Sequence, residues 1–194
     1  MTDTAVFANL GRSVSELSGT WTLDPAHTSV EISVRHMMVA TVRGRLRPLR
    51  GELHLDAEDP YKSFVDVELD AASVDTGNPD RDKHLRSADF LDTEHHPTIT
   101  FRSTEVRDEG DGTYVITGDL TLKNETRPVT LQTEVGGVIR DPFGNDRIGF
   151  SATGTIDRSE FGLTWNAALE GGGLMLGDKL KVNIDAEFTR QPGG

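Results

Sequence analysis

The chain has 194 residues, a length that suits a single domain with a substantial hydrophobic core. Its formal charge of −12 argues against nucleic acid as a partner, and the absence of cysteine excludes disulfides and cysteine-based metal or redox sites. No segment is long and apolar enough to span a membrane, and residues 1–19 lack the basic and apolar parts of a secretory signal, so we expect a cytoplasmic protein.

After a leader at residues 1–18, which allows one or two helical turns near residue 15, apolar and polar residues alternate repeatedly. The strands predicted by this alternation lie at 28–37, 40–56, 64–70, 98–106, 113–122, 127–135, 146–156 and 177–190. Short turn sequences at 109–112, 123–126 and 141–146 predict hairpins between successive strands. We therefore expect one antiparallel all-β domain of eight or nine strands over residues 19–190, followed by a tail at 191–194.

The segment 40–56 changes phase. Val42 and Leu46 occupy even positions, whereas Leu49, Leu53 and Leu55 occupy odd ones, with Pro48 between the two sets. A β-bulge near Pro48 would keep both sets facing inward and bend the strand.

Residues 81–101, RDKHLRSADFLDTEHHPTITF, concentrate charged and histidine side chains just before a strand. Asn78 is a candidate N-cap and Pro79 suits the first helical position, so we expect a short helix there that ends before Pro97. Arg81 and Asp82 are expected to form a local ion pair that fixes this helix to the barrel.

A sheet of this size with one apolar face must pair with a second sheet or close into a barrel. A barrel of about eight strands is either filled by side chains or holds one small ligand. The inward faces carry many small residues, which either leave room for a ligand or mark bends: Gly44, Gly51, Ser103, Gly118, Ala152, Gly154 and Ala186. These two interpretations have about equal weight on the pattern alone.

The sequence offers no recognisable catalytic or metal motif. His95 and His96 are adjacent and so point to opposite sides of an extended chain, and the other histidines have no metal-ligand spacing. Glycine-rich phosphate loops and the G-x-S-x-G nucleophile motif are absent from the sequence. We expect no catalytic residues, no metal ion and no cofactor.

His36 falls on the apolar face formed by Val30, Ile32 and Val34. The more common role of such a residue is that of a core histidine with a satisfied hydrogen bond. The alternative is a polar anchor inside an apolar cavity.

Four segments together resemble the YceI family of polyisoprenoid-binding, lipocalin-like proteins. The segments are WTLDPAHTSVEISVRHMMVATVRG at 21–44, SVDTGNPDRDKHLRSADFLDTEHHPTITF at 73–101, GDLTLKNETRPVTL at 118–131 and IDRSEFGL at 156–163. The resemblance implies an elongated, lipocalin-like antiparallel barrel, with one or two short helical segments, that binds an isoprenoid chain in its lumen. It also implies that residues 81–101 are a structural signature and not an active site.

The expected ligand is a polyprenyl phosphate, a quinone or another amphipathic lipid, for which the protein is a carrier or a store. Most ligand contacts are predicted by the shared phase of the strands, and His36 and Met38 are added because they lie at or beyond the end of their strand. The predicted contacts are Val30, Ile32, Val34, His36, Met38, Phe101, Ile116, Leu120, Leu131, Phe150, Ile156, Leu180 and Ile184. Candidates for holding the head group are Arg35, Arg81 and His84, although strict alternation turns Arg35 outward. A homodimer is compatible with this interpretation.

Two alternatives stay open. The first is a lipid-modifying isomerase or hydrolase that uses His36 or His84 as an acid–base group. The second is a stress-linked protein whose barrel is filled. The apolar inward faces and the missing nucleophile–base pair favour the carrier.

Overall fold

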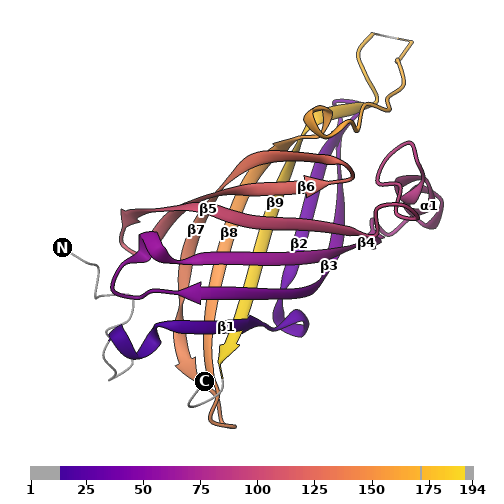
Figure 1. Cartoon of the computed structure of the whole chain (residues 1–194). Coiled ribbons are helices and arrows are strands. Elements are labelled where there is room, and N and C mark those ends of the chain that lie inside the picture. Colours follow the sequence, from indigo (N-terminus) through magenta and orange to yellow (C-terminus); the bar gives the residue numbers. More distant parts are fainter. Residues whose placement is uncertain (1–13, 171, 191–194) are drawn as a thin grey trace.

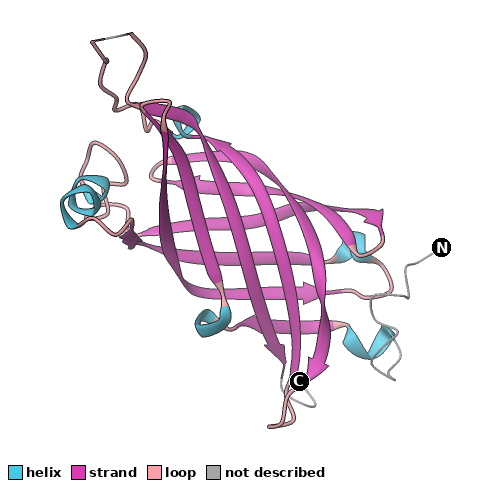
Figure 2. Cartoon of the chain, turned by 180° about the vertical axis from the view of Figure 1, so that it is seen from behind, coloured by secondary structure: helices cyan, strands magenta, loops and turns pink. Residues whose placement is uncertain are grey.

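The computed structural model describes residues 14–170 and 172–190. Within these residues, nine strands form one antiparallel sheet that closes on itself, which confirms the predicted barrel (Figure 1 and Figure 2). The strands are β1 (Gly19–Leu23), β2 (Ser29–His36), β3 (Ala40–Leu55), β4 (Phe64–Asp75), β5 (Thr98–Gly110), β6 (Thr113–Leu122), β7 (Glu125–Arg140), β8 (Asp146–Asp157) and β9 (Leu176–Arg190). The helical elements are α1 (Pro79–Arg86) and the 3₁₀ turns η2 (Val14–Leu17), η3 (Pro25–His27), η4 (Pro60–Lys62) and η5 (Arg158–Phe161).

The sheet closes because β3 pairs with β2 on one side and with β4 on the other. β1 and β2 share one position in the barrel, since both of them pair with β3 and with β9. The nine described strands therefore occupy eight positions, a size at which side chains either fill the interior or leave room for one small ligand.

The register of β3 shifts at two places, between Arg45 and Arg47 and between Pro48 and Arg50. The second shift is the bulge that the phase change predicts. Pro48 is buried, and the inward positions change from even to odd numbers after it. The expectation that Leu49 faces inward is wrong, because Leu49 lies in the bulge with 44 % of its surface exposed.

The two ends of the barrel carry different elements (Figure 1). The α1 end carries α1, the β2–β3 turn at 37–39 and the connection from η5 to β9. The η4 end carries η4 and the turns that join β5 to β6 and β7 to β8. These names are used below for the two openings.

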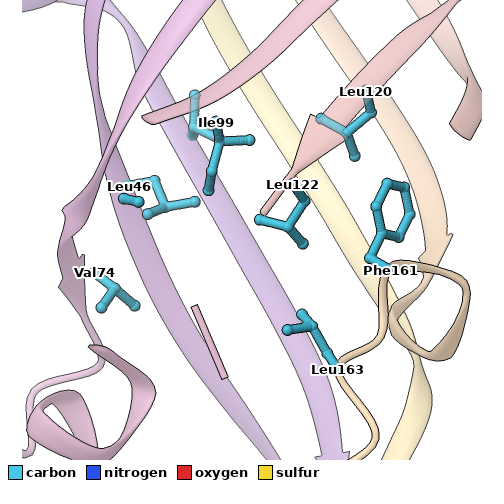
Figure 3. Packing of buried hydrophobic residues seen from close by; sticks show 9 residues of the cluster. Leu46, Val74, Ile99, Leu120, Leu122, Phe161 and Leu163 are labelled. Atoms are coloured by element: carbon cyan, nitrogen blue, oxygen red, sulfur yellow. The ribbon is translucent and has the colours of Figure 1, made fainter. Parts of the chain in front are cut away.

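Two hydrophobic clusters fill parts of the interior. The cluster nearer the α1 end includes Leu46, Ile99, Leu120 and Leu122, whose side chains point into the space that the strands enclose (Figure 3). The cluster nearer the η4 end is built around Trp21, which is fully buried.

Helix α1 begins where the sequence predicts. The Asn78 side chain accepts a hydrogen bond from the Arg81 backbone N–H at 3.1 Å, and Pro79 occupies the first helical position. The helix is fixed to the barrel through Thr76, which directly follows β4, in place of the expected ion pair. Arg81 Nε donates to Thr76 Oγ1 at 2.7 Å, and the buried Asp82 carboxylate accepts from the Thr76 backbone N–H at 2.9 Å.

Part of the expected leader is packed against the η4 end. Leu17 in η2 is buried, and its carbonyl accepts a hydrogen bond from Trp21 Nε1 at 3.1 Å. The Arg190 guanidinium lies 4.6 Å above the centre of the Trp21 ring and donates to the Ser18 carbonyl at 2.8 Å. Residues 1–13 of the leader and the tail 191–194 lie outside the described residues.

Candidate functional site

The interior contains a cavity at each end of the barrel. The α1-end cavity has a volume of about 420 Å³, and the η4-end cavity has a volume of about 260 Å³. Cavities that hold small ligands usually measure about 300–1,000 Å³. The apolar wall of the larger cavity is formed by Ile32, Val34, Val42, Val74, Leu85, Phe90, Leu91, Leu163, Trp165, Met175, Leu176 and Leu180.

A packed layer lies between the two cavities. No residue lines both of them, and Leu46 of β3, which lies between Gly44 of one lining and Leu53 of the other, is buried in a hydrophobic cluster. We call this layer the waist and define it by Phe101 over Gly118 and Leu131 over Gly154. A Cβ atom at Gly118 would lie 2.5 Å from Cζ of Phe101, and one at Gly154 would lie 2.7 Å from Cδ2 of Leu131. These two glycines make room for neighbouring side chains, so they do not themselves widen the lumen. The barrel is thus filled at its waist and hollow at both ends.

The residues predicted to line the lumen divide among these regions. Ile32, Val34, His36 and Leu180 line the α1-end cavity, and Ile116 and Phe150 line the η4-end cavity. The others belong to the waist or to the cluster beside it: Val30, Phe101, Leu120, Leu131, Ile156 and Ile184. Their contact with a ligand stays a prediction.

His36 is a polar group in the apolar wall of the α1-end cavity. It ends β2, and its imidazole makes no hydrogen bond with any residue that the structure describes. The expectation of a core histidine with a satisfied hydrogen bond is therefore not met among those residues. A ring in this position is free to bind a polar group that enters the cavity.

Arg81 and His84 also line the α1-end cavity. His84 Nε2 lies 2.8 Å from a carboxylate oxygen of Asp89, and the ring packs edge-on against Phe90 and Trp165 at 5.1 and 4.8 Å between ring centres. These contacts fix the orientation of the imidazole between α1 and the segment that follows η5. Asp80 is the acidic residue of the same lining.

Arg158 is a site residue that the sequence pattern did not reveal. It is 3 % exposed, lines the α1-end cavity and donates to the carbonyls of Gly177, Leu163 and Trp165. Asp178 lies 3.2 Å from its guanidinium and balances the buried charge. Arg158 therefore holds the segment that carries Leu163 and Trp165 over the cavity. Its only signal in the sequence is its place in the segment IDRSEFGL.

Two of the predicted site residues lie away from the cavities. Arg35 points outward and donates to the Met38 carbonyl at 2.7 Å. Met38 lies at the tip of the β2–β3 turn with 74 % of its surface exposed, and it is not among the residues that line the α1-end cavity. The alternation of side chains ends at this turn, so the strand pattern did not apply to Met38.

The described residues include one cluster with the composition of a metal site, formed by Asp24, His27 and Glu187. Arg147 Nη1 already lies 3.0 Å from the Asp24 carboxylate and also pairs with Glu187. The hydrogen bond from His27 lowers the pKa of Asp24, and Arg147 lowers it further. The cluster thus has a cation of its own, and the expected absence of a metal ion stays a prediction.

The closed antiparallel barrel with its hollow ends is a lipocalin-like fold. Among the described residues, no helix is long and apolar enough to cross a membrane. The chain belongs to the YceI-like family, because the model of the YceI-like domain matches residues 21–188.

Relatives and solved structures agree with this assignment. A UPF0312 protein of Staphylococcus epidermidis is 36% identical over 167 residues, which cover 86% of this chain and 95% of that protein. A UPF0312 protein of Ectopseudomonas mendocina is 42% identical over 138 residues, which cover 71% of this chain and 72% of that protein.

Two solved structures share the fold. The YceI protein of Campylobacter jejuni has a TM-score of 0.66 and 28% identity, and the match covers 81% of this chain and 90% of that one. A polyisoprenoid binding domain from Saccharophagus degradans has a TM-score of 0.62 and 12% identity, and the match covers 87% of this chain and 97% of that one.

Proposed function

We propose that this protein binds a long-chain isoprenoid or a similar amphipathic lipid in the α1-end cavity and acts as its carrier or store. The observation that carries the proposal is an apolar cavity of about 420 Å³ whose wall includes the imidazole of His36, which has no hydrogen-bond partner among the described residues. The fold of the Saccharophagus degradans polyisoprenoid binding domain supports the proposal.

Affinity and orientation come from different parts of this cavity. Apolar contact contributes about 25 cal/mol for each Å² of ligand surface that is buried, but it does not distinguish one end of a hydrocarbon from the other. Orientation requires polar groups placed where the head of the ligand lies. His36, Arg81 and His84 supply hydrogen-bond donors there, so the head group is proposed to lie at the α1 end with the chain directed toward the waist.

The guanidinium groups in the wall of the α1-end cavity favour a head group that accepts hydrogen bonds. Arg81 and Arg158 both line the cavity, and Asp80 is the acidic residue of the lining. Both guanidinium groups are held by protein carbonyls, which keep them in place before a ligand arrives. A phosphate or a quinone oxygen is a suitable partner for such donors.

The substitution His36→Ala tests the proposal in a displacement titration with a fluorescent lipid probe. The competitors are geranylgeranyl phosphate and a hydrocarbon of equal chain length. We expect the affinity for the phosphate to fall about tenfold, since a hydrogen bond to a charged group contributes about 1.5–3 kcal/mol. We expect the affinity for the hydrocarbon to change much less.

His54→Ala is the matched control. His54 is half-buried in β3 and its ring stacks on Phe64, so the variant removes a histidine without touching the α1-end cavity. Equal losses for both lipids in His36→Ala would show that the head group lies elsewhere. Failure of the unmodified protein to bind either lipid would refute the carrier.

The contact between His84 and Asp89 favours a second candidate function, that of a lipid-modifying enzyme. A histidine oriented by a carboxylate beside an apolar cavity is suited to acid–base chemistry on a bound lipid. Mass spectrometry of the lipid before and after incubation distinguishes the two functions. A lipid that is unchanged after incubation supports the carrier. Conversion of the lipid by the unmodified protein, together with no conversion by His84→Gln, supports the enzyme.

A further inference from the structure

The wall of the η4-end cavity includes a buried hydroxyl group that lacks a hydrogen-bond partner among the described residues. Thr133 lies in β7 opposite Tyr114 and Ala152, and its side chain faces this cavity. The residue is 3 % exposed, and its Oγ1 has no hydrogen-bond partner among the residues that the structure describes. Buried hydroxyl groups in proteins nearly always have a partner, so this atom points to a ligand or a water molecule in the cavity.

Ser103 is the second buried residue with a hydroxyl group in the wall of the η4-end cavity. It is buried, and its Oγ accepts a hydrogen bond from the Val65 backbone N–H at 2.8 Å. That bond uses a lone pair and leaves the hydroxyl proton available. Four hydroxyl-bearing residues line the cavity, and Ser103 and Thr133 are the two that are buried. Ile116, Val135 and Phe150 contribute apolar surface to the same wall.

The charges around the η4-end cavity limit what can enter it. The lining includes Asp56, Glu58 and Asp108, and its described residues include no lysine, arginine or histidine. An anionic group is therefore repelled at this end. An anionic group would also lose its hydration beside Thr133, without a cationic side chain in the described lining to replace it.

We propose that the η4-end cavity is a second binding site, which takes a small neutral amphiphile whose alcohol or ketone oxygen hydrogen-bonds to Thr133 Oγ1. A threonine hydroxyl both donates and accepts, so it suits either oxygen. The site is separate from the α1-end cavity, because the waist lies between them and no residue lines both. The proposal does not depend on the lipid bound at the α1 end.

Titrations of ¹⁵N-labelled protein with 1-hexanol, 2-hexanone, hexane and hexanoate test this site by NMR. We expect the alcohol and the ketone to shift the amide signals of Ser103, Ile116 and Thr133, while those of His36 and Trp165 stay in place. They should bind about tenfold more tightly than hexane, the difference expected of one hydrogen bond to a buried group. Hexanoate should bind more weakly than hexanol.

Thr133→Val removes the hydroxyl group and keeps the shape of the side chain, and Thr133→Ser keeps the hydroxyl group. In Thr133→Val the advantage of hexanol over hexane should disappear while hexane binding is unchanged, and Thr133→Ser should retain the advantage. Ile116→Trp, which fills the cavity, should abolish the binding of all four compounds. Denaturant unfolding of each variant verifies that it is folded.

Three outcomes would overturn the proposal. The first is an equal preference for hexanol in Thr133→Val and the unmodified protein, which would assign the Thr133 hydroxyl to a structural water molecule. The second is a set of shifts confined to the α1 end, and the third is no shift at all. Each is distinct from a failure of the carrier function, which is measured by long isoprenoids at the α1-end cavity.

Discussion

Substituting Gly118 by alanine tests the waist of the barrel. A Cβ atom at this position would lie 2.5 Å from Cζ of Phe101 and 2.6 Å from the carbonyl oxygen of Arg102. Real Cβ atoms essentially never approach other atoms this closely, and one of these neighbours is backbone, so strand β5 and the ring must both move. We therefore expect Gly118→Ala to destabilise the protein.

The size of the effect follows from two opposing contributions. Overpacking a well-packed interior costs about 1–3 kcal/mol. Replacing glycine by alanine where the backbone allows it restricts the unfolded chain and returns about 0.4–1 kcal/mol. The φ angle of Gly118 is not positive, so the second contribution applies. The net loss in the free energy of unfolding is therefore expected to be about 1–2 kcal/mol.

Two other glycines complete a graded series. At Gly154 the closest atom is Cδ2 of Leu131, the end of a flexible side chain, at 2.7 Å, so Gly154→Ala should cost less than Gly118→Ala. Gly149 lies in β8 with no atom within 4 Å of its added Cβ and without a positive φ angle, so Gly149→Ala should be neutral or slightly stabilising. Urea unfolding of the three variants measures the order. Equal stabilities for Gly118→Ala and Gly149→Ala would refute the packed waist.

Two further predictions concern the turns. Met38 adopts a left-handed conformation with φ of 60° in the β2–β3 turn. Glycine adopts this conformation without steric cost, so Met38→Gly should raise the free energy of unfolding by up to about 1 kcal/mol. A decrease in the urea midpoint would contradict this account. The hydrogen bond from Arg147 lowers the pKa of Asp141 from 3.8 to about 2. The ionised carboxylate therefore stabilises the fold above the pKa of the unfolded chain, and this stabilisation is lost as the pH falls from about 4 to 2. The stability deficit of Asp141→Asn should therefore be full at pH 7 and shrink below pH 4, whereas parallel stability curves for the two proteins would disprove the linkage.

The strands were predictable because one face of each is buried and side chains alternate along it. The same local rules identified the N-cap at Asn78 and the bulge near Pro48, since both depend on the residues themselves and their immediate neighbours. Leu49 shows the limit of the rule. A bulge places one extra residue on the strand, and the alternation does not say which residue that will be.

The packing between strands was not predictable in the same way. Whether Gly118 leaves space or is covered depends on Phe101, which lies on a neighbouring strand and 17 positions away in the sequence. The split of the interior into two cavities follows from such pairs, so the pattern of small residues could not distinguish an open lumen from a filled one. The burial of Arg158 was not predicted for a related reason. A charged residue is expected to be exposed, and the carbonyl groups that bind this guanidinium come from other segments and turns.

The difference in charge between the two cavities is the basis for the proposed direction of a bound lipid. The α1-end cavity is lined by Arg81, Arg158, two histidines and one acidic residue, Asp80, whereas the charged residues of the η4-end lining are Asp56, Glu58 and Asp108. Arg158 is paired with Asp178, so Arg81 is the guanidinium without a carboxylate partner among the described residues. Because the whole chain has a formal charge of −12, an anionic lipid meets repulsion over most of the surface, and the α1 end is the opening that offers it cationic groups. In the proposed binding mode the chain end of the lipid lies at the waist, where the Phe101 ring over Gly118 would limit how far the chain extends.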